Sequence, residues 1–318
     1  MIGAPGPWDT EPVGDRTELA IACCRSADDA DPADLYPDPD SELLVGALRE
    51  LGLRARMVSW DDPRLAWDAF DLVVVRSTWD SVDRPDEYRR WAWSVQAKTC
   101  LINSAEVLTW NLDKSYLAEL AGAGVPVVPT QFVQPGGIWS PPGAEFVLKP
   151  AISAGGRETA RYGPDHHDEA IEHLQRLLGT GRTAMVQPYL PAVEDPGEIS
   201  LVYLGGVFSH AVRKGPVLEA GAGVVERPWE RMVYLGRDEP SPSEMTAAAR
   251  VQATLEHRFG PLVYSRVDLV SDPDGQPVVI EVELVDPYLS LTMEPGAADR
   301  LAGALQRVAA LARDSRSR

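Results

Sequence analysis

The sequence predicts a mixed α/β fold, with an open α/β arrangement in its N-terminal part and a more β-rich α+β arrangement further on. Its length of 318 residues favours two or three domains, because a domain usually holds about 150 residues. Hydrophobic residues make up 44% and charged residues 25% of the chain, as in ordinary globular proteins. Apolar residues recur with strand and helix periods in alternation along the N-terminal part, which is typical of an open α/β sheet.

Charge and cysteine content restrict the partners and the compartment. The formal net charge is −18, so we expect neither nucleic acid nor an anionic membrane as a partner. Residues 1–16 are rich in Gly and Pro and predict a disordered extension without a signal-peptide core. No stretch reaches the roughly 20 apolar residues that span a bilayer. Three scattered cysteines predict neither a disulfide framework nor a zinc site, so we expect a reduced, cytoplasmic protein.

The first part of the chain alternates strands and helices. We expect strands at 18–24, 54–60 and 70–75, and helices from the N-cap Ser41 to 51 and at 85–97. Open α/β sheets bind ligands beyond the carboxyl ends of their strands, where Arg76, Ser77, Trp79 and Asp80 follow a buried run. Arg76 needs a partner, either a substrate carboxylate or Asp80. Trp79 could equally be a core aromatic residue.

The remaining elements form two further groups. A helix at 112–122, strands at 146–148 and 184–186, and a helix at 167–178 come first. From residue 198 the chain turns to β-structure: we expect strands at 199–204, 207–212, 263–270 and 277–282, with helices at 243–259 and 299–313. Gly205-Gly206 and the turn at 272–275 indicate hairpins.

The last hairpin carries three carboxylates. Asp268 and Arg266 share one face of a strand, and Glu281 and Glu283 share one face of the next strand, because side chains alternate along a strand. If the register sets these faces together, the carboxylates converge and would repel one another unless cations lie between them. Mg²⁺ prefers such oxygen ligands. The alternative is a solvated sheet face with ordinary surface charges.

Lysine is scarce, which draws attention to the positions where it occurs. Only four of the 30 basic residues are lysines, namely Lys98, Lys114, Lys149 and Lys214. Lys149 ends an apolar strand and is followed by a loop with Ser153, Gly155 and Gly156. Such a loop can direct backbone N–H groups at phosphate oxygens beside a lysine, although a Gly-Gly pair is more often an ordinary turn.

A third motif follows the strand at 184–186. Gln187, Pro188, Tyr189 and Leu190 leave the strand through a proline, and Glu194 and Glu198 come shortly after. Backbone groups that no neighbouring strand uses can recognise an adenine edge, and an acid can bind ribose hydroxyls. The alternative is a strand end followed by surface acids.

Taken in order, these motifs resemble the ATP-grasp superfamily over about residues 19–311. The resemblance implies an N-terminal α/β domain (17–110), a central lobe (111–190) and a C-terminal lobe (191–318), with ATP sandwiched between the two lobes. Lys114 and Lys149 match the family's phosphate-binding lysines, and Gln187 to Leu190 with Glu194 match its adenine hinge and ribose acid. Asp268, Glu281 and Glu283 match the metal ligands, although most relatives have Asn where Glu283 stands. Within the superfamily, residues 76–80 and 281–287 look most like the D-cycloserine synthetase group of antibiotic biosynthesis, which closes O-ureido-D-serine.

The resemblance also implies an activity. It is an ADP-forming C–N ligation, within one molecule or between two, in which a small amino-acid-like carboxylate becomes an acylphosphate. ATP and two Mg²⁺ ions are implied, with Mn²⁺ as a substitute. Arg266 matches the arginine that faces the oxyanion, and Arg213 and Lys214 lie where relatives contact phosphate or substrate. The substrate would lie against Arg76, Ser77, Trp79, Asp80 and Ser290, and a homodimer is implied. Ligation of a ribosomal peptide, and nucleotide binding without catalysis, are the alternatives.

Overall fold

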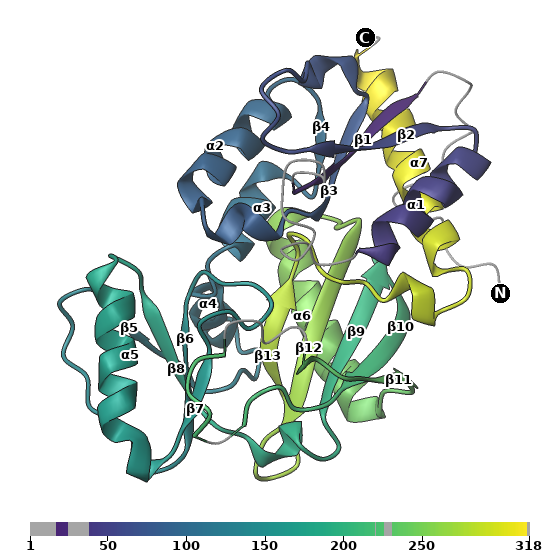
Figure 1. The fold of residues 1–318 in the computed structure, drawn as a ribbon. Coiled ribbons are helices and arrows are strands. Elements are labelled where there is room, and N and C mark those ends of the chain that lie inside the picture. Colours follow the sequence, from purple (N-terminus) through teal and green to yellow (C-terminus); the bar gives the residue numbers. More distant parts are fainter. Residues whose placement is uncertain (1–16, 25–37, 220, 226–230, 317–318) are drawn as a thin grey trace.

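Three β-sheets organise the chain in the computed structural model, which describes residues 17–24, 38–219, 221–225 and 231–316 (Figure 1). The expected N-terminal extension, 1–16, lies outside the described residues. The first sheet has the strand order β2-β1-β3-β4, and the other two have the orders β5-β8-β6-β7 and β11-β10-β9-β12-β13. No helix in the described ranges has the length and apolar character that a membrane span requires.

The first sheet is parallel and begins the chain. Its strands and helices are β1 (Glu18–Cys23), α1 (Pro39–Glu50), β2 (Arg54–Ser59), β3 (Leu72–Ser77), α2 (Pro85–Gln96), β4 (Cys100–Ile102) and α3 (Ala105–Asn111). The N-cap of α1 is Asp38 and not Ser41, because the Asp38 side chain accepts a hydrogen bond from the Ser41 backbone N–H and Pro39 occupies the first helical position. That arrangement suits both residue types. Strand β4 is three residues long, too short for its pattern to be recognised.

The second sheet is antiparallel and belongs to the middle of the chain. It consists of β5 (Gln131–Val133), β6 (Phe146–Pro150), β7 (Ala160–Tyr162) and β8 (Ala184–Pro188), and α5 (His167–Gly179) packs on it. The helix that we expected at 112–122 is shorter and begins later: α3 ends at Asn111, and α4 spans Tyr116–Gly122. Lys114 therefore lies in the turn between two helices.

The third sheet is also antiparallel. Its strands are β9 (Glu198–Leu204), β10 (Val207–Lys214), β11 (Tyr234–Asp238), β12 (Tyr264–Ser271) and β13 (Pro277–Glu283). Helix α6 (Pro242–Phe259) begins with a capping box between Ser241 and Glu244, which satisfies two backbone N–H groups at that end.

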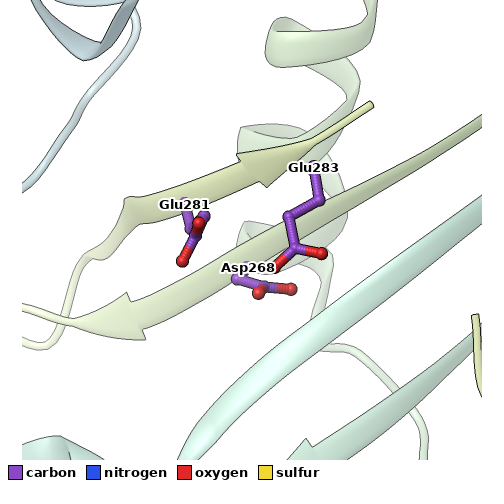
Figure 2. A group of neighbouring side chains, drawn as sticks. All are labelled: Asp268, Glu281 and Glu283. Atoms are coloured by element: carbon purple, nitrogen blue, oxygen red, sulfur yellow. The ribbon is translucent and has the colours of Figure 1, made fainter. Parts of the chain in front are cut away.

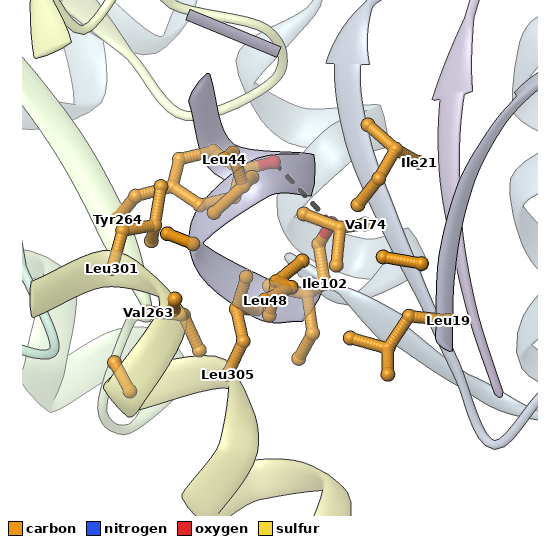
Figure 3. Close-up of a cluster of buried hydrophobic side chains, with 14 of the residues drawn as sticks. Leu19, Ile21, Leu44, Leu48, Val74, Ile102, Val263, Tyr264, Leu301 and Leu305 are labelled. Atoms are coloured by element: carbon orange, nitrogen blue, oxygen red, sulfur yellow. Dashed lines mark hydrogen bonds between the residues drawn. The ribbon is translucent and has the colours of Figure 1, made fainter. Parts of the chain in front are cut away.

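The last helix, α7 (Ala297–Arg316), returns to the start of the chain and packs against α1. Figure 3 shows the resulting apolar cluster, in which Leu301 and Leu305 of α7 meet Leu44 and Leu48 of α1. Tyr264 at the start of β12 belongs to the same cluster, so it joins the first and third sheets. Burial of this many apolar side chains holds the two ends of the chain together.

Candidate active site

The three acids of the last hairpin lie together on one face of the third sheet (Figure 2). Asp268 is directly opposite Glu281, and Arg266 is opposite Glu283. One carboxylate oxygen from each acid lies within 4.8 Å of the others. The antiparallel register therefore brings the predicted faces together, and the oxygens could share a divalent cation.

Basic side chains surround these carboxylates. Arg266 donates to Asp268 through Nε (2.8 Å) and Nη2 (2.7 Å), and Nη2 also reaches Glu283 Oε1 at 2.6 Å. Lys214 Nζ lies 3.1 Å from Asp268 Oδ2 and also pairs with Glu198. Burial alone would raise the pKa of Asp268, but Arg266 and Lys214 outweigh it and hold that pKa well below its usual range.

Glu283 differs from its neighbours in its electrostatics. Burial raises the pKa of Glu283 to about 7, and the nearby charges of Glu281 and Asp268 add to the rise although Arg266 opposes it. The pKa of Glu281 is lowered instead, because Lys114 and Lys149 together outweigh the cost of burial. A carboxylate crowded by other carboxylates in this way is a site that a cation would stabilise.

Lys114, from the turn before α4, and Lys149, from β6 of the second sheet, approach the cluster. Lys114 Nζ lies 3.2 Å from Glu281 Oε1 and donates to the Ser153 carbonyl oxygen at 2.5 Å. Burial lowers the pKa of Lys149, against the charge of Glu281, which acts to raise it. The loop after Lys149 has Gly155 at φ 59° and Gly156 at φ 73°, a region that glycine occupies readily. The loop and both lysines therefore border the carboxylates.

Two residues of β9 join the site without having been assigned to it from the sequence. Glu198 pairs with Lys214, and the Ser200 hydroxyl donates to Asp268 Oδ1 at 2.7 Å. Both face the cluster because β9 pairs with β12, with Ser200 opposite Asp268. The spacing of two between them was the available signal, but only the sheet order shows which face they occupy.

The residues after β8 form a polar cluster of their own. Tyr189 donates from its hydroxyl to Glu194 Oε1 at 2.8 Å, and Arg161 pairs with Glu194 at 2.8 Å while stacking on the Tyr189 ring. The Tyr189 N–H is not free as expected, since it donates to the Glu145 carbonyl oxygen at 3.0 Å. A cavity of about 550 Å³ opens beside Glu194 and Arg161 and reaches residues 216–219.

The other residues of this motif have separate surroundings. The Gln187 side chain donates to Thr130 Oγ1 at 2.9 Å, Pro188 is exposed, and Leu190 packs in a small apolar group with Val128. Arg213 is not brought to the carboxylates, because its guanidinium pairs with Asp238 and Glu244. Lys214, the next residue, is the one that reaches Asp268.

Arg76 is buried beside the segment that follows β13. Its Nη2 donates to the Pro287 carbonyl oxygen at 2.9 Å, whereas Nε and Nη1 have no hydrogen-bond partner among the described residues. Its nearest carboxylate is Asp40, with Nη2 3.9 Å from Oδ2. Asp80, the partner considered from the sequence, instead accepts from Trp60 Nε1 at 2.7 Å and pairs with Arg84.

The three other residues predicted to bind substrate, Ser77, Trp79 and Ser290, differ in their contacts, burial and backbone conformation. The Ser77 hydroxyl bonds to Asp38 and lies 3.2 Å from the Ser41 hydroxyl. Trp79 is half-buried at the start of a short 3₁₀ helix. Ser290 is buried with a left-handed backbone at φ 52°, which is uncommon for a residue with a side chain.

Comparison with known proteins gives consistent matches along most of the chain. Residues 19–103 match the family model described as "D-cycloserine synthetase DcsG, N-terminal domain". The "Cycloserine biosynthesis protein DcsG" of Streptomyces lavendulae is 37% identical over 288 residues, which cover 86% of this chain and 95% of that protein.

Solved structures agree with these sequence matches. The crystal structure of D-cycloserine synthetase DcsG superimposes with a TM-score of 0.82 and 33% identity, covering 92% of this chain and 99% of that one. A D-alanine–D-alanine ligase from Bacillus anthracis, complexed with ATP, has a TM-score of 0.62 at 12% identity and covers 95% and 99% of the two chains. The second match concerns the fold alone.

Proposed function

Because the chain belongs to the D-cycloserine synthetase family of ATP-grasp ligases, we propose that its carboxylate cluster is the metal centre of an ADP-forming C–N ligation. The protein is an ATP-dependent carboxylate–amine ligase. The reaction we propose activates a small amino-acid-like carboxylate and closes an amide-type bond, within one molecule or between two. The observation that carries the proposal is the convergence of Asp268, Glu281 and Glu283 beside two lysines.

The donor set fits a divalent cation that prefers oxygen. All three ligands are carboxylates, and their oxygens lie close enough to share an ion. We propose that Asp268, Glu281 and Glu283 hold two Mg²⁺ ions, for which Mn²⁺ can substitute. Bound there, the ions would neutralise the phosphate oxygens of ATP.

The balance of charge around the cluster supports this assignment. Four acids, Asp268, Glu281, Glu283 and Glu198, are matched by four bases, Arg266, Lys214, Lys114 and Lys149. The charges of ATP and two divalent cations cancel one another, so the loaded site would stay near neutrality. Glu283 therefore fits as a ligand with one more negative charge than the family's usual asparagine.

The nucleotide would lie between the second and third sheets. We propose that Lys114, Lys149, Lys214 and the N–H groups of the loop with Ser153, Gly155 and Gly156 contact its phosphates. Gln187, Pro188, Tyr189 and Leu190 would line the adenine, and Glu194 would bind the ribose beside the cavity described above. Arg213 is not proposed as a direct phosphate contact, because Asp238 and Glu244 pair with its guanidinium.

The proposed chemistry is the reaction that the family resemblance implies. A substrate carboxylate oxygen attacks the γ-phosphorus of ATP, and the bond from that phosphorus to the β–γ bridging oxygen breaks. The products of this step are ADP and an acylphosphate. A neutral nitrogen then adds to the acyl carbon, phosphate departs with the C–O electron pair, and the nitrogen loses a proton. Arg266 would stabilise the negative oxygen of the tetrahedral intermediate, a role in which the loss of one donor typically costs about 10²–10³ in kcat.

Substrate recognition is proposed for the first sheet and the segment after β13. The unpartnered Nε and Nη1 atoms of Arg76 are donors that suit the oxygens of a carboxylate, since hydrogen bonds from a guanidinium to a carboxylate are strong. Ser77, Trp79, Asp80 and Ser290 are proposed to complete the pocket. We also propose the domain limits 17–110, 111–190 and 191–318, a homodimer, a cytoplasmic location and a place in antibiotic biosynthesis.

The test is a coupled assay of ADP release with purified protein, Mg²⁺ and a panel of amino acids that carry a side-chain nitrogen. O-Ureido-D-serine and its enantiomer belong in that panel. We expect ADP formation to require one such acid and to disappear in Glu281→Gln. ATP binding without ADP formation from any carboxylate would contradict the proposal, and full activity of Glu281→Gln would contradict the metal assignment.

A further inference from the structure

Residues 284–291, here called the strap, connect β13, the strand of Glu281 and Glu283, with a short 3₁₀ helix (Leu291–Met293). The strap contains no helix or strand up to residue 290, yet side chains from other elements satisfy its polar groups one after another. Asn103 donates to the Leu284 carbonyl oxygen at 2.8 Å, Tyr264 donates to that of Val285 at 2.9 Å, and Asp40 accepts from the Leu291 N–H at 2.8 Å. Buried backbone groups need such partners, so the strap is held in one conformation by its surroundings.

Three consecutive carbonyl oxygens of the strap each accept a bond from a different basic side chain. Arg76 of β3 donates to Pro287 at 2.9 Å, Arg266 of β12 donates to Tyr288 at 3.1 Å, and Nε2 of His210 lies 2.8 Å from the Leu289 carbonyl oxygen. All three donors are buried. The middle bond of the three therefore fixes the arginine of the carboxylate cluster, and the two outer bonds fix the carbonyls on either side of it.

His210 is suited to a fixed, uncharged role. A carbonyl oxygen only accepts, so Nε2 carries the proton and Nδ1 is left to accept from the Ser209 hydroxyl, 2.9 Å away. Burial lowers the pKa of His210, although Glu294 and the Leu289 carbonyl oxygen act to raise it and Arg300 and Arg237 add to the lowering. The proposed reaction uses no general base, so this histidine has no other role in it.

The hydrogen bond from Arg266 to the Tyr288 carbonyl oxygen would gain importance once metal ions bind Asp268 and Glu283. Nε and Nη2 of Arg266 are bonded to Asp268 and Glu283, whereas Nη1 is bonded to the Tyr288 carbonyl oxygen. Metal ions on Asp268 and Glu283 would compete for the oxygens that hold Nε and Nη2. The Tyr288 carbonyl oxygen then remains as the contact that aims the guanidinium.

We propose that His210 is a positioning residue for the reaction: by holding the Leu289 carbonyl it keeps that of Tyr288, and through it Arg266, in the orientation that catalysis requires. This inference rests on the proposed function of Arg266. Displacement of a catalytic group by about 1 Å can cost about 10²-fold in rate, which sets the scale of the effect. A residue that only stabilised the fold would not change kcat in this selective way.

The experiment is a double-mutant cycle in the coupled ADP assay at saturating ATP and Mg²⁺. We expect His210→Phe to lower kcat by about 10- to 100-fold with the KM for ATP within about twofold of the wild type. His210→Gln should recover most of the loss, because its amide can donate to the same carbonyl. In an Arg266→Lys background, which keeps the charge but lacks the donor to Tyr288, His210→Phe should cost little more.

The matched control is His173→Phe, another buried histidine with one ring nitrogen bonded inside the protein, to the Tyr162 hydroxyl at 3.0 Å. We expect this variant to keep the wild-type kcat. Ser209→Ala removes the hydroxyl that orients His210 without removing a buried ring, and it should lower kcat less than His210→Phe does. The inference therefore stays testable if His210→Phe does not fold.

Several outcomes would separate the inference from the function on which it rests. Equal costs of His210→Phe in both backgrounds, or equal kcat values for His210→Phe and His210→Gln, would overturn the positioning role. Wild-type kcat in both His210→Phe and Ser209→Ala would also overturn it and leave the ligase assignment intact. Full kcat in Arg266→Lys would instead overturn the proposed role of Arg266, and the inference with it.

Discussion

Replacing Asp268 by asparagine preserves the shape of the side chain but removes its charge and one acceptor oxygen. The carboxylate is 1% exposed and accepts from Arg266 at 2.7 and 2.8 Å, from Lys214 at 3.1 Å and from Ser200 at 2.7 Å. The amide nitrogen that replaces one oxygen donates hydrogen bonds and cannot accept them. It would therefore face the neighbouring donor groups without forming a bond. The buried charges of Arg266 and Lys214 would also lose their shared counter-ion.

The size of the effect follows from these contacts. At about 3 Å and an effective dielectric constant of about 20, each ion pair corresponds to about 5 kcal/mol of Coulomb energy. Desolvation offsets much of this, and Glu283 and Glu198 remain as partial partners. We therefore expect the free energy of unfolding to fall by about 3–5 kcal/mol, as when one member of a buried pair is removed.

The effect on catalysis should be larger. Loss of a metal ligand that supplies about 4 kcal/mol to the transition state corresponds to about a 10³-fold lower rate of ADP formation. Urea unfolding followed by tryptophan fluorescence and the coupled ADP assay measure the two effects separately. Asp274→Asn, in the exposed turn of the same hairpin, is the matched control and should change stability by less than about 0.5 kcal/mol. Near-normal turnover of Asp268→Asn would refute the metal assignment.

Three further predictions address the site and its supports. Glu283→Asn should retain turnover but raise the Mg²⁺ concentration for half-maximal rate by about tenfold, since affinity depends on ligand charge; an unchanged Mg²⁺ dependence would show that Glu283 is not a ligand. Tyr264→Phe removes the hydroxyl that donates to the Val75 and Val285 carbonyl oxygens at 2.8 and 2.9 Å. It should lower the free energy of unfolding in urea by about 1–3 kcal/mol. An unchanged free energy of unfolding would show that this hydroxyl does not help to join the first and third sheets. Burial lowers the pKa of His173 from 6.5 to about 4, so unfolding takes up a proton in that range and stability falls as the pH drops through it. At pH 5 the wild type should therefore lose about 2 kcal/mol that His173→Gln does not lose, and equal losses in both proteins would contradict the shifted pKa.

The hairpin of β12 and β13 shows how much of the site a local sequence pattern can predict. Alternation along each strand places Asp268 and Arg266 on one face and Glu281 and Glu283 on one face, and the turn at 272–275 predicts that the strands pair. Whether those faces coincide depends on register, and a slip by one residue would have moved one set to the other side. The structure places Asp268 opposite Glu281, which no single-strand pattern could decide.

Helix boundaries and the partners of charged side chains were predicted less well from the sequence. The pattern at 112–122 did not reveal that α3 ends at Asn111 and α4 starts at Tyr116, because apolar periodicity continues across the short turn between them. The sequence pattern also did not distinguish Arg213 from Lys214. In the structure Arg213 pairs with Asp238 and Glu244, whereas Lys214 pairs with Asp268. Neighbouring residues of a strand face opposite sides, and only the sheet order shows which side is the site.

The sequence by itself determined the order of most strands and helices, the spacing of the carboxylates and lysines, and the glycine loop, because each depends on residues close together in the chain. The tertiary structure decided the contributions of Glu198 and Ser200, the return of α7 to α1, and the side chains that hold the strap. His210 and Leu289, for example, lie 79 positions apart in the chain. Such contacts form only when distant segments pack, so their partners are set by the whole fold and not by any local pattern.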